Sequence, residues 1–189
     1  MPLIESSTGC VIITNGAVRS CQAGWDMEKP GKVFDARSLE KLTKIFARNK
    51  VSYLIIGKFG AIIYGFPDTT QDIDVFPEKT VGNGRRIAAS LTELGFAIDS
   101  PLEKAILEGK DFIQIRGGPF DIDLIFAPDG LESFEETKKR SSLVDKKYPV
   151  ASLDDIIKSK KCASRNKDKE VLGRLKEFGQ YLKQRRFGD

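Results

Sequence analysis

The stretch VSYLIIGKFGAIIYGFPDTTQDIDVF, residues 51–76, decides the fold that we expect for this chain. Residues 51–56 form an almost continuous apolar run that stops at Gly57, which is typical of a strand buried on both faces. A short helix can follow this turn, and the Phe-Pro-Asp sequence at 66–68 ends it. Acidic and apolar residues then alternate over 72–76, which indicates a second strand. The stretch therefore predicts strand, glycine turn, short helix, loop and strand.

Two acids on the second of these strands point to cation chemistry. Asp72 and Asp74 are two residues apart, so they face the same side of a strand, while Ile73 and Val75 point into a core. Two adjacent like charges are unfavourable unless protons or a cation neutralise them. Mg²⁺ suits such oxygen ligands and is usually held by one or two carboxylates together with substrate phosphates.

The turn between the two strands has the composition of a phosphate-binding turn. Gly57 and Gly60 bracket Lys58 and Phe59. Glycine allows backbone N–H groups to come close to a bound phosphate, and the start of a helix adds a favourable dipole there.

A second acidic strand follows later in the chain. Residues 112–116 and 120–126 predict two strands joined as a hairpin by Gly-Gly-Pro at 117–119. The second strand, FDIDLIF, carries Asp121 and Asp123, again two residues apart and so on one face.

The remaining elements complete an α/β protein with a short mixed sheet flanked by helices and a helical C-terminal part. The N-terminal residues predict either a hairpin around Asn15-Gly16, which Trp25, Cys10 and Cys21 would pack onto the body of the protein, or a loose extension. We expect helices at 36–48, 84–94, 133–140, 152–164 and from Asn166 onward, and a short helix or a turn at 102–107. We also expect a loop at 80–83, a short strand at 96–98 and extended segments at 144 and 148–150. This predicts an N-terminal extension at 1–34, a core at 35–150 and a basic helical part at 151–189.

Composition excludes several classes of protein. The chain has 189 residues, of which 40% are hydrophobic, so it can build one good core. Histidine is absent, which excludes a histidine general base and a Ser-His or Cys-His dyad, and three cysteines without a C-x-x-C do not suggest zinc. The apolar runs are strand-sized and the N-terminus does not fit a signal peptide, so we expect no membrane span and a cytoplasmic location.

Positive charge is concentrated at the C-terminal end. From Lys158 onward the sequence has 11 Lys and Arg against 4 Asp and Glu, a net charge of +7, while the remainder has 20 against 23, or −3. Such a basic segment can bind phosphates or nucleic acid, or it can be a solvated helix face.

The segment IIGKFGAIIYGFPDTTQDIDVF resembles the signature of the nucleotidyltransferase superfamily typified by DNA polymerase beta, with a glycine turn, a carboxylate pair and a third carboxylate on a later strand. The C-terminal stretch SLDDIIKSKKCASRNKDKEVL also resembles the small bacterial members, which include aminoglycoside-modifying enzymes and abortive-infection-type toxins. The resemblance covers about residues 36–182. The chain departs from the pattern at two positions: Lys58 stands where the family usually has Gly or Ser, and Asp68 where many relatives carry a basic residue.

The resemblance implies roles for particular residues. Asp72 and Asp74 would hold two Mg²⁺ ions, or Mn²⁺ in their place, and a third acid would complete the metal site and help to deprotonate the acceptor. Asp123 is the preferred third acid because it directly precedes the apolar end of its strand, and Asp121 is the alternative. The implied contacts to the nucleoside triphosphate, such as ATP, are Gly57, Lys58, Thr70, Lys160, Arg165 and Lys167.

Three functions are consistent with these observations. The first is transfer of a nucleoside monophosphate to a hydroxyl group, with RNA or tRNA preferred as the acceptor because of the basic C-terminal segment, and an antibiotic or a protein side chain as alternatives. The second is a catalytically weak nucleotide- or RNA-binding module, in which Lys58 closes the pocket instead of contacting phosphate. The third is an interaction component of a two-gene system, with a cognate antitoxin as its partner.

Overall fold

The computed structural model describes residues 10–14, 17–19, 36–163 and 166–186, and describes side chains within 36–163 and 171–185. The strands are β1 (Cys10–Thr14), β2 (Ala17–Arg19), β3 (Tyr53–Ile56), β4 (Asp72–Pro77), β5 (Phe112–Ile115), β6 (Asp121–Ile125), β7 (Ser142–Val144) and β8 (Tyr148–Val150). The helices are α1 (Ala36–Arg48), α2 (Gly57–Ile63), α3 (Val81–Leu94), α4 (Ser100–Glu108), α5 (Phe134–Arg140), α6 (Leu153–Ala163) and α7 (Asn166–Arg186).

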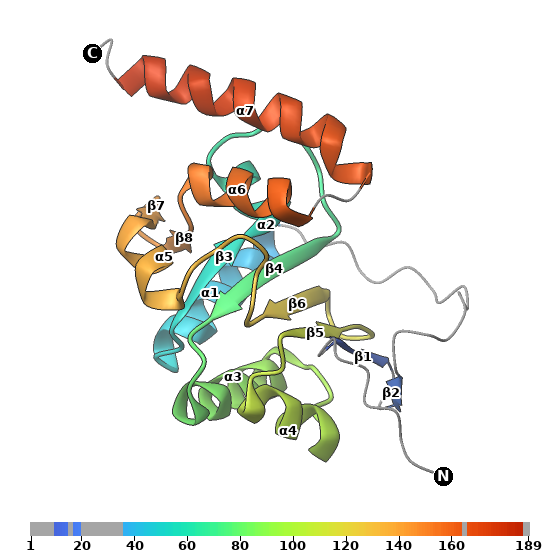
Figure 1. The fold of residues 1–189 in the computed structure, drawn as a ribbon. Coiled ribbons are helices and arrows are strands. Elements are labelled where there is room, and N and C mark those ends of the chain that lie inside the picture. Colours follow the sequence, from blue (N-terminus) through green and yellow to red (C-terminus); the bar gives the residue numbers. More distant parts are fainter. Residues whose placement is uncertain (1–9, 15–16, 20–35, 164–165, 187–189) are drawn as a thin grey trace.

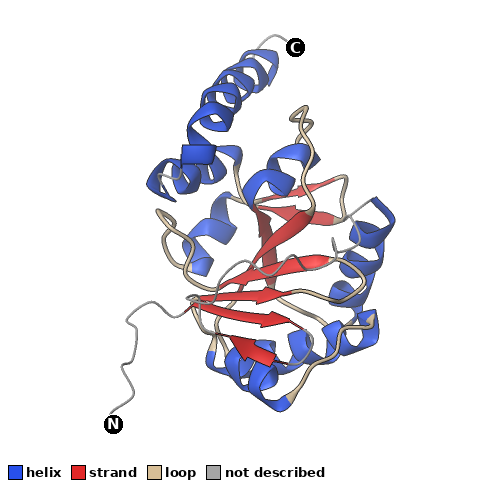
Figure 2. Cartoon of the chain, turned by 90° about the vertical axis from the view of Figure 1, so that its right-hand side faces the viewer, coloured by secondary structure: helices blue, strands red, loops and turns tan. Residues whose placement is uncertain are grey.

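The described strands form one mixed sheet, in the order β2-β1-β5-β6-β4-β3-β8-β7 (Figure 2). The pairs β1–β5, β4–β6 and β3–β8 are parallel, whereas β3–β4, β5–β6 and the two terminal hairpins are antiparallel. The parallel pairs are joined by long connections that contain helices, as parallel pairing requires. The predicted α/β fold class with a short mixed sheet and flanking helices is therefore confirmed.

Helices cover both faces of the sheet. Figure 1 shows α6 and α7 on one side and α3 and α4 on the other. Alternation along the central strands matches this arrangement, because Ile73 and Val75 of β4 and Ile122 and Leu124 of β6 are all fully buried and occupy the positions that alternate with the aspartates. The apolar face therefore builds a core with the helices beneath it, and the acidic face is left toward α6 and α7.

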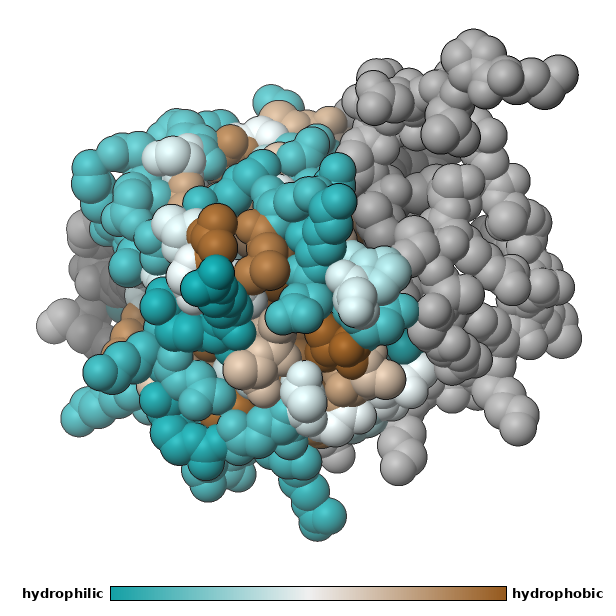
Figure 3. Space-filling model, turned by 90° about the horizontal axis from the view of Figure 1, so that it is seen from below, coloured by the Kyte–Doolittle hydropathy of each residue, from teal (hydrophilic) through white to brown (hydrophobic). Residues whose placement is uncertain are grey.

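Most of the surface beneath the sheet is hydrophilic. Seen from the side of α3 and α4, the molecule shows mainly hydrophilic residues with a few small hydrophobic patches (Figure 3). The apolar stripe of α3 is turned inward, with Ile87, Leu91 and Leu94 at 2% exposure or less. Within the described part of the chain, no helix is long and apolar enough to pass through a lipid bilayer.

A buried asparagine fastens α3 to the sheet. Asn83 is fully buried; its Oδ1 accepts from the Ser52 N–H at 2.8 Å, and its Nδ2 donates to the carbonyls of Ser52 and Glu78 at 2.8 and 2.9 Å. Thr80 caps the helix by accepting from the Asn83 N–H. For this reason α3 starts at Val81, three residues before the predicted start, and part of the predicted loop at 80–83 is helical.

Other local predictions are confirmed with small shifts of boundary. The helices predicted at 36–48 and 133–140 are present, and Ser133 and Ser152 each accept from the backbone N–H three residues later, as expected of their capping boxes. The prediction of a strand at 96–98 is wrong, because these residues form neither a strand nor a helix. Gly95 ends α3 in the left-handed conformation, and Phe96 packs edge-on against Phe120 with ring centroids 5.2 Å apart.

The hairpin predicted around Asn15-Gly16 is confirmed by its strands, because β1 and β2 pair antiparallel. β1 also pairs with β5, so this hairpin extends the sheet of the core. The turn residues themselves, Cys21 and Trp25 lie outside the described residues.

Candidate active site

Four aspartates lie side by side on two neighbouring strands. β4 and β6 pair in parallel, with Asp72 opposite Asp121 and Asp74 opposite Asp123. Since residues two apart on a strand face the same side, all four carboxylates belong to one face of the sheet. The sequence predicted each pair, and strand pairing brings the two pairs together.

Gly57 brings the backbone directly against this carboxylate group. It follows β3, whose last residue is paired with Asp74, and it has a positive φ of 65°. A Cβ atom built on Gly57 would lie only 1.8 Å from Oδ2 of Asp74. A residue with a side chain would therefore both clash with Asp74 and strain the backbone, so this turn requires glycine.

Arg116 is the counter-ion of the acids on β6. Its Nη1 lies 2.6 Å from Oδ1 of Asp123, and its Nε lies 3.5 Å from Oδ2 of Asp121. Gln114 on β5 donates to the other oxygen of Asp123 at 3.4 Å. Asp123 is only 5% exposed; burial raises its pKa, and the hydrogen bond from Arg116 opposes that rise.

Asp74 holds a proton more strongly than an ordinary aspartate. Burial, followed by the negative charges of Asp123 and Asp72, raises the pKa of Asp74 to about 7, although Lys160 and Arg116 oppose the rise. This carboxylate therefore keeps a proton at pH values where an ordinary aspartate is fully ionised. A cation bound among the carboxylates would displace this proton and relieve the repulsion.

The carboxylates open into a cavity of about 660 Å³ between the sheet and α6 and α7. Asp72, Asp74 and Asp123 line the cavity, whereas the lining does not include Asp121. Its other polar or charged lining residues are Lys58, Thr70, Asp111, Gln114, Asp129, Ser159 and Lys160. The volume is within the range of small-molecule sites.

The predicted nucleotide contacts fall into two groups. Gly57, Lys58, Thr70 and Lys160 all line the cavity, and Thr70 donates to Oδ1 of Asp72 at 2.7 Å. Arg165 lies outside the described residues. Lys167 belongs to the first turn of α7, where only the backbone is described, so the predicted roles of Arg165 and Lys167 stay predictions.

Gly60 has a packing role. A Cβ atom there would come within 3.0 Å of Ile156 on α6 and 3.2 Å of Val150 on β8. The residue is buried, so it allows α2 and α6 to pack closely. Of the two glycines in the turn, Gly57 lines the cavity, and Gly60 allows close packing of α6, the helix that carries Lys160.

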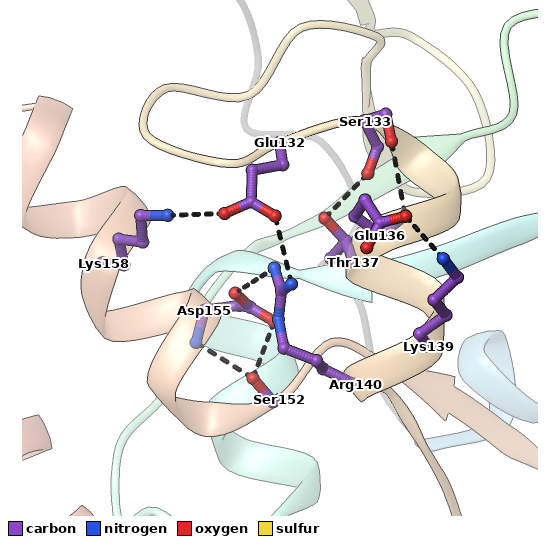
Figure 4. A network of polar contacts seen from close by, with 9 residues as sticks. All are labelled: Glu132, Ser133, Glu136, Thr137, Lys139, Arg140, Ser152, Asp155 and Lys158. Carbon is purple, nitrogen blue, oxygen red and sulfur yellow. Dashed lines mark hydrogen bonds and ion pairs between the residues drawn. The ribbon is translucent and has the colours of Figure 1, made fainter.

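A network of polar side chains holds α6 in place over the cavity (Figure 4). Arg140, the last residue of α5, contacts both oxygens of the buried Asp155 at 2.9 and 3.1 Å. Arg140 also contacts Glu132 at 3.1 Å, and Glu132 in turn lies 3.3 Å from Lys158. Paired contacts between a guanidinium and a carboxylate fix orientation as well as distance, so the start of α6 has a defined position relative to α5.

The sequence interpretation did not identify Arg116 or Gln114 as site residues. The signal was present in the predicted hairpin, because β5 and β6 pair Gln114 with Asp123 and Ile115 with Ile122. Continuing that register sets Arg116 opposite Asp121. Lys58 and Asp68, the two positions at which the sequence departs from the pattern that it resembles, also prove to be partners. Nζ of Lys58 lies 3.8 Å from Oδ1 of Asp68.

The donor chemistry of the site suits a hard divalent cation. Asp72, Asp74 and Asp123 supply only carboxylate oxygens, which are the ligands that Mg²⁺ and Mn²⁺ prefer. Within the described residues, however, no three His, Cys, Asp or Glu side chains are already arranged as a metal centre. The third carboxylate, on Asp123, is engaged with Arg116.

Comparison with known proteins found only distant structural likeness. No protein-family model matches the sequence, and no curated protein matches it significantly. A crystal structure from Thermotoga maritima, described as a "putative nucleotidyltransferase", matches with a TM-score of 0.45 and 15% identity, covering 80% of this chain and 90% of that one. A likeness at this level does not assign an activity.

Proposed function

We propose that this protein is a Mg²⁺-dependent nucleotidyltransferase that moves a nucleoside monophosphate from a nucleoside triphosphate to a hydroxyl acceptor, with pyrophosphate as the leaving group. One observation carries the proposal: Asp72 and Asp74 on β4 stand in register with Asp121 and Asp123 on β6, against a turn at Gly57 that tolerates no side chain. A fold needs no such crowding of like charges, because it costs stability. Binding of a cation by these acids would explain the crowding.

The residues of the cavity have separate tasks in this proposal. Asp72, Asp74 and Asp123 would hold Mg²⁺, which would stabilise charge on the attacking and leaving oxygens. Lys58 and Lys160 line the same cavity and would bind the triphosphate through their ammonium groups. Asp123 would accept the proton of the acceptor hydroxyl, because a buried carboxylate with a raised pKa is a better base than an exposed one.

Label transfer tests the proposal directly. The protein is incubated with Mg²⁺, each α-labelled nucleoside triphosphate in turn and either total cell RNA or small hydroxyl compounds such as aminoglycosides. Transfer that depends on Mg²⁺, is lost in Asp74→Asn and is retained in Glu103→Gln, an exposed change on α4, supports the proposal. Transfer that survives Asp74→Asn would contradict it.

RNA is the acceptor that we propose, on the strength of the basic C-terminal segment. At the end of α7, Arg185 is exposed, and Lys183 is exposed although it contacts Asp154 at 2.9 Å. Contacts of such residues with RNA release counterions, with a slope of about −0.7 per phosphate in a plot of log affinity against log salt. Binding should therefore weaken steeply as salt is raised.

A triple replacement by Gln tests the acceptor. The residues changed are Lys183, Arg185 and Arg186. The control replaces three exposed lysines elsewhere, Lys41, Lys104 and Lys110. We expect the first set to weaken RNA binding and flatten its salt dependence while triphosphate binding stays nearly unchanged. RNA binding that is absent, or equally reduced by both sets, favours a small-molecule acceptor.

A second candidate function is nucleotide or RNA binding with little catalysis. The contact between Arg116 and Asp123 favours it, because a carboxylate neutralised by a guanidinium is a poor base and a poor metal ligand. Single-turnover measurements separate the two functions. Triphosphate binding without any transfer, in the wild-type protein and over all four bases, would support the binding module.

A further inference from the structure

Lys58 is a cavity residue whose charge is already partly engaged. It is the second residue of α2 and lines the cavity, with 31% of its side chain exposed. Its Nζ lies 3.8 Å from Oδ1 of Asp68, which is an ion pair but longer than a good hydrogen bond. Such a contact is easily exchanged, because a lysine side chain is long and its ammonium group is a compact point charge.

Asp68 is held from two other directions. Its Oδ1 accepts from the Thr69 N–H at 2.7 Å, and its Oδ2 lies 3.3 Å from Nη1 of Arg174 on α7. The hydrogen bond from Thr69, together with the charges of Lys58 and Arg174, lowers the pKa of Asp68 although burial opposes this. Asp68 therefore stays charged and would keep a partner after losing Lys58.

Arg174 joins this loop to α7. Its Nη2 donates to the Pro67 carbonyl at 2.8 Å, and its guanidinium lies over the Phe66 ring at 5.2 Å. Phe66 also packs edge-on against Phe178 of α7. One turn before Arg174, Val171 of α7 lines the cavity. The same helix therefore borders the cavity and contacts the loop that carries Asp68.

We propose that Asp68 is a positioning residue that holds Lys58 at the cavity wall and gives it up to the phosphates of the bound triphosphate. On binding, the ammonium group of Lys58 turns from the carboxylate to a phosphate oxygen, and Asp68 remains paired with Arg174 and Thr69. No charge is left unpaired by this exchange. A phosphate group carries more negative charge than a carboxylate, so it competes well for the lysine. This inference rests on the proposed nucleotide-binding function.

The exchange makes Asp68 a competitor of the triphosphate. Removing its charge should therefore tighten binding, whereas removing Lys58 should weaken it. Neutralising Arg174 should act in the opposite direction to neutralising Asp68, because Asp68 then depends more strongly on Lys58. A purely structural role for Asp68 predicts no tightening in any variant.

Calorimetric titration with inorganic triphosphate and Mg²⁺ tests these directions on the full chain. The probe carries the phosphates without a base, so base preference does not enter. We expect Lys58→Gln to weaken binding about tenfold and Asp68→Asn to tighten it about threefold, as charge-assisted and partly exposed ion pairs suggest. Arg174→Gln should weaken binding by a factor of about two, and the control Lys176→Gln, an exposed change two residues along α7, should have no effect.

The double variant Lys58→Gln/Asp68→Asn isolates the exchange. Asp68→Asn should lose its tightening effect once Lys58 is absent, because the two residues then have no shared contact to disrupt. Asn can still accept from the Thr69 N–H, and Tm measured for every variant checks that the fold is intact. In turnover, Asp68→Asn should change KM and leave kcat nearly unchanged.

The outcomes separate this inference from the proposed function. If the wild-type protein binds Mg²⁺-triphosphate but Asp68→Asn binds it equally or more weakly with an unchanged Tm, the role of Asp68 is overturned and the proposed function stands. If Asp68→Asn tightens binding equally with and without Lys58, the exchange is overturned. If the wild-type protein does not bind the probe at all, both are overturned.

Discussion

Replacing Asp74 by Asn should stabilise the ligand-free protein at pH 8 and have little effect on its stability at pH 4. The pKa of this carboxyl is raised from 3.8 to about 7, first by burial and then by the charges of Asp123 and Asp72. The folded state therefore binds more protons than the unfolded state between these two values. The stabilisation from the bound proton is fully present below about pH 4 and is lost as the pH rises through about 7.

The size of the effect follows from this difference of about three pH units. At about 1.4 kcal/mol for each unit, the charged form of Asp74 would lower the free energy of unfolding by about 4 kcal/mol. Solvent reaches Asp74 in part, so screening reduces the expected value to on the order of 2 kcal/mol. Asn has nearly the same shape and no charge, so it removes the repulsion without leaving a void.

Urea unfolding at pH 4, 5, 6, 7 and 8 measures this difference, with Asp129→Asn as the control. Asp129 lines the same cavity but is exposed on the loop after β6, so its replacement should leave the pH dependence unchanged. Addition of Mg²⁺ with a triphosphate should then stabilise the wild-type protein and not Asp74→Asn. Equal stability of wild type and Asp74→Asn at pH 8 would refute the electrostatic reasoning. Equal ligand-induced stabilisation of the two would refute the metal-binding role.

Three further changes test other parts of the site and its support. Asp123→Asn should lower turnover far more than nucleotide affinity, and Asp121→Asn should lower turnover less than Asp123→Asn does. Measurement of kcat and Kd for both variants tests this, and a larger loss of kcat in Asp121→Asn would show that Asp121 is the third acid. Gly57→Ala should abolish triphosphate binding and lower the free energy of unfolding by roughly 1–3 kcal/mol, because it combines a left-handed backbone with a clash against Asp74; binding retained in this variant would show that the turn adapts. Asn83→Ala should cost about 2 kcal/mol in urea unfolding, because it leaves the Ser52 N–H and the Glu78 carbonyl unpaired, whereas the Ser52 carbonyl still accepts from the Glu78 N–H; a loss below 1 kcal/mol would mean that water replaces these bonds.

Much of the fold was determined by local patterns that a single sequence displays. Strand alternation at 72–76 and capping by Ser133 and Ser152 depend on residues only a few positions apart, and both were predicted correctly. Of the two alternatives left open for the N-terminal residues, the hairpin around Asn15-Gly16 is the one that forms. The strand predicted at 96–98 does not form, because Phe96 directly follows the glycine that ends α3 and packs into the core.

The sequence by itself therefore determined which side chains share a strand face, because side-chain direction follows from the two-residue repeat of a strand. Beyond the two hairpins, it did not determine which strands become neighbours. Only the tertiary structure set Asp74 beside Asp123, paired Lys58 with Asp68 and Arg174, and joined the N-terminal hairpin to β5. These contacts join segments far apart in the chain, and their choice depends on burying the apolar faces of all the strands and helices at once, which no short stretch of sequence encodes.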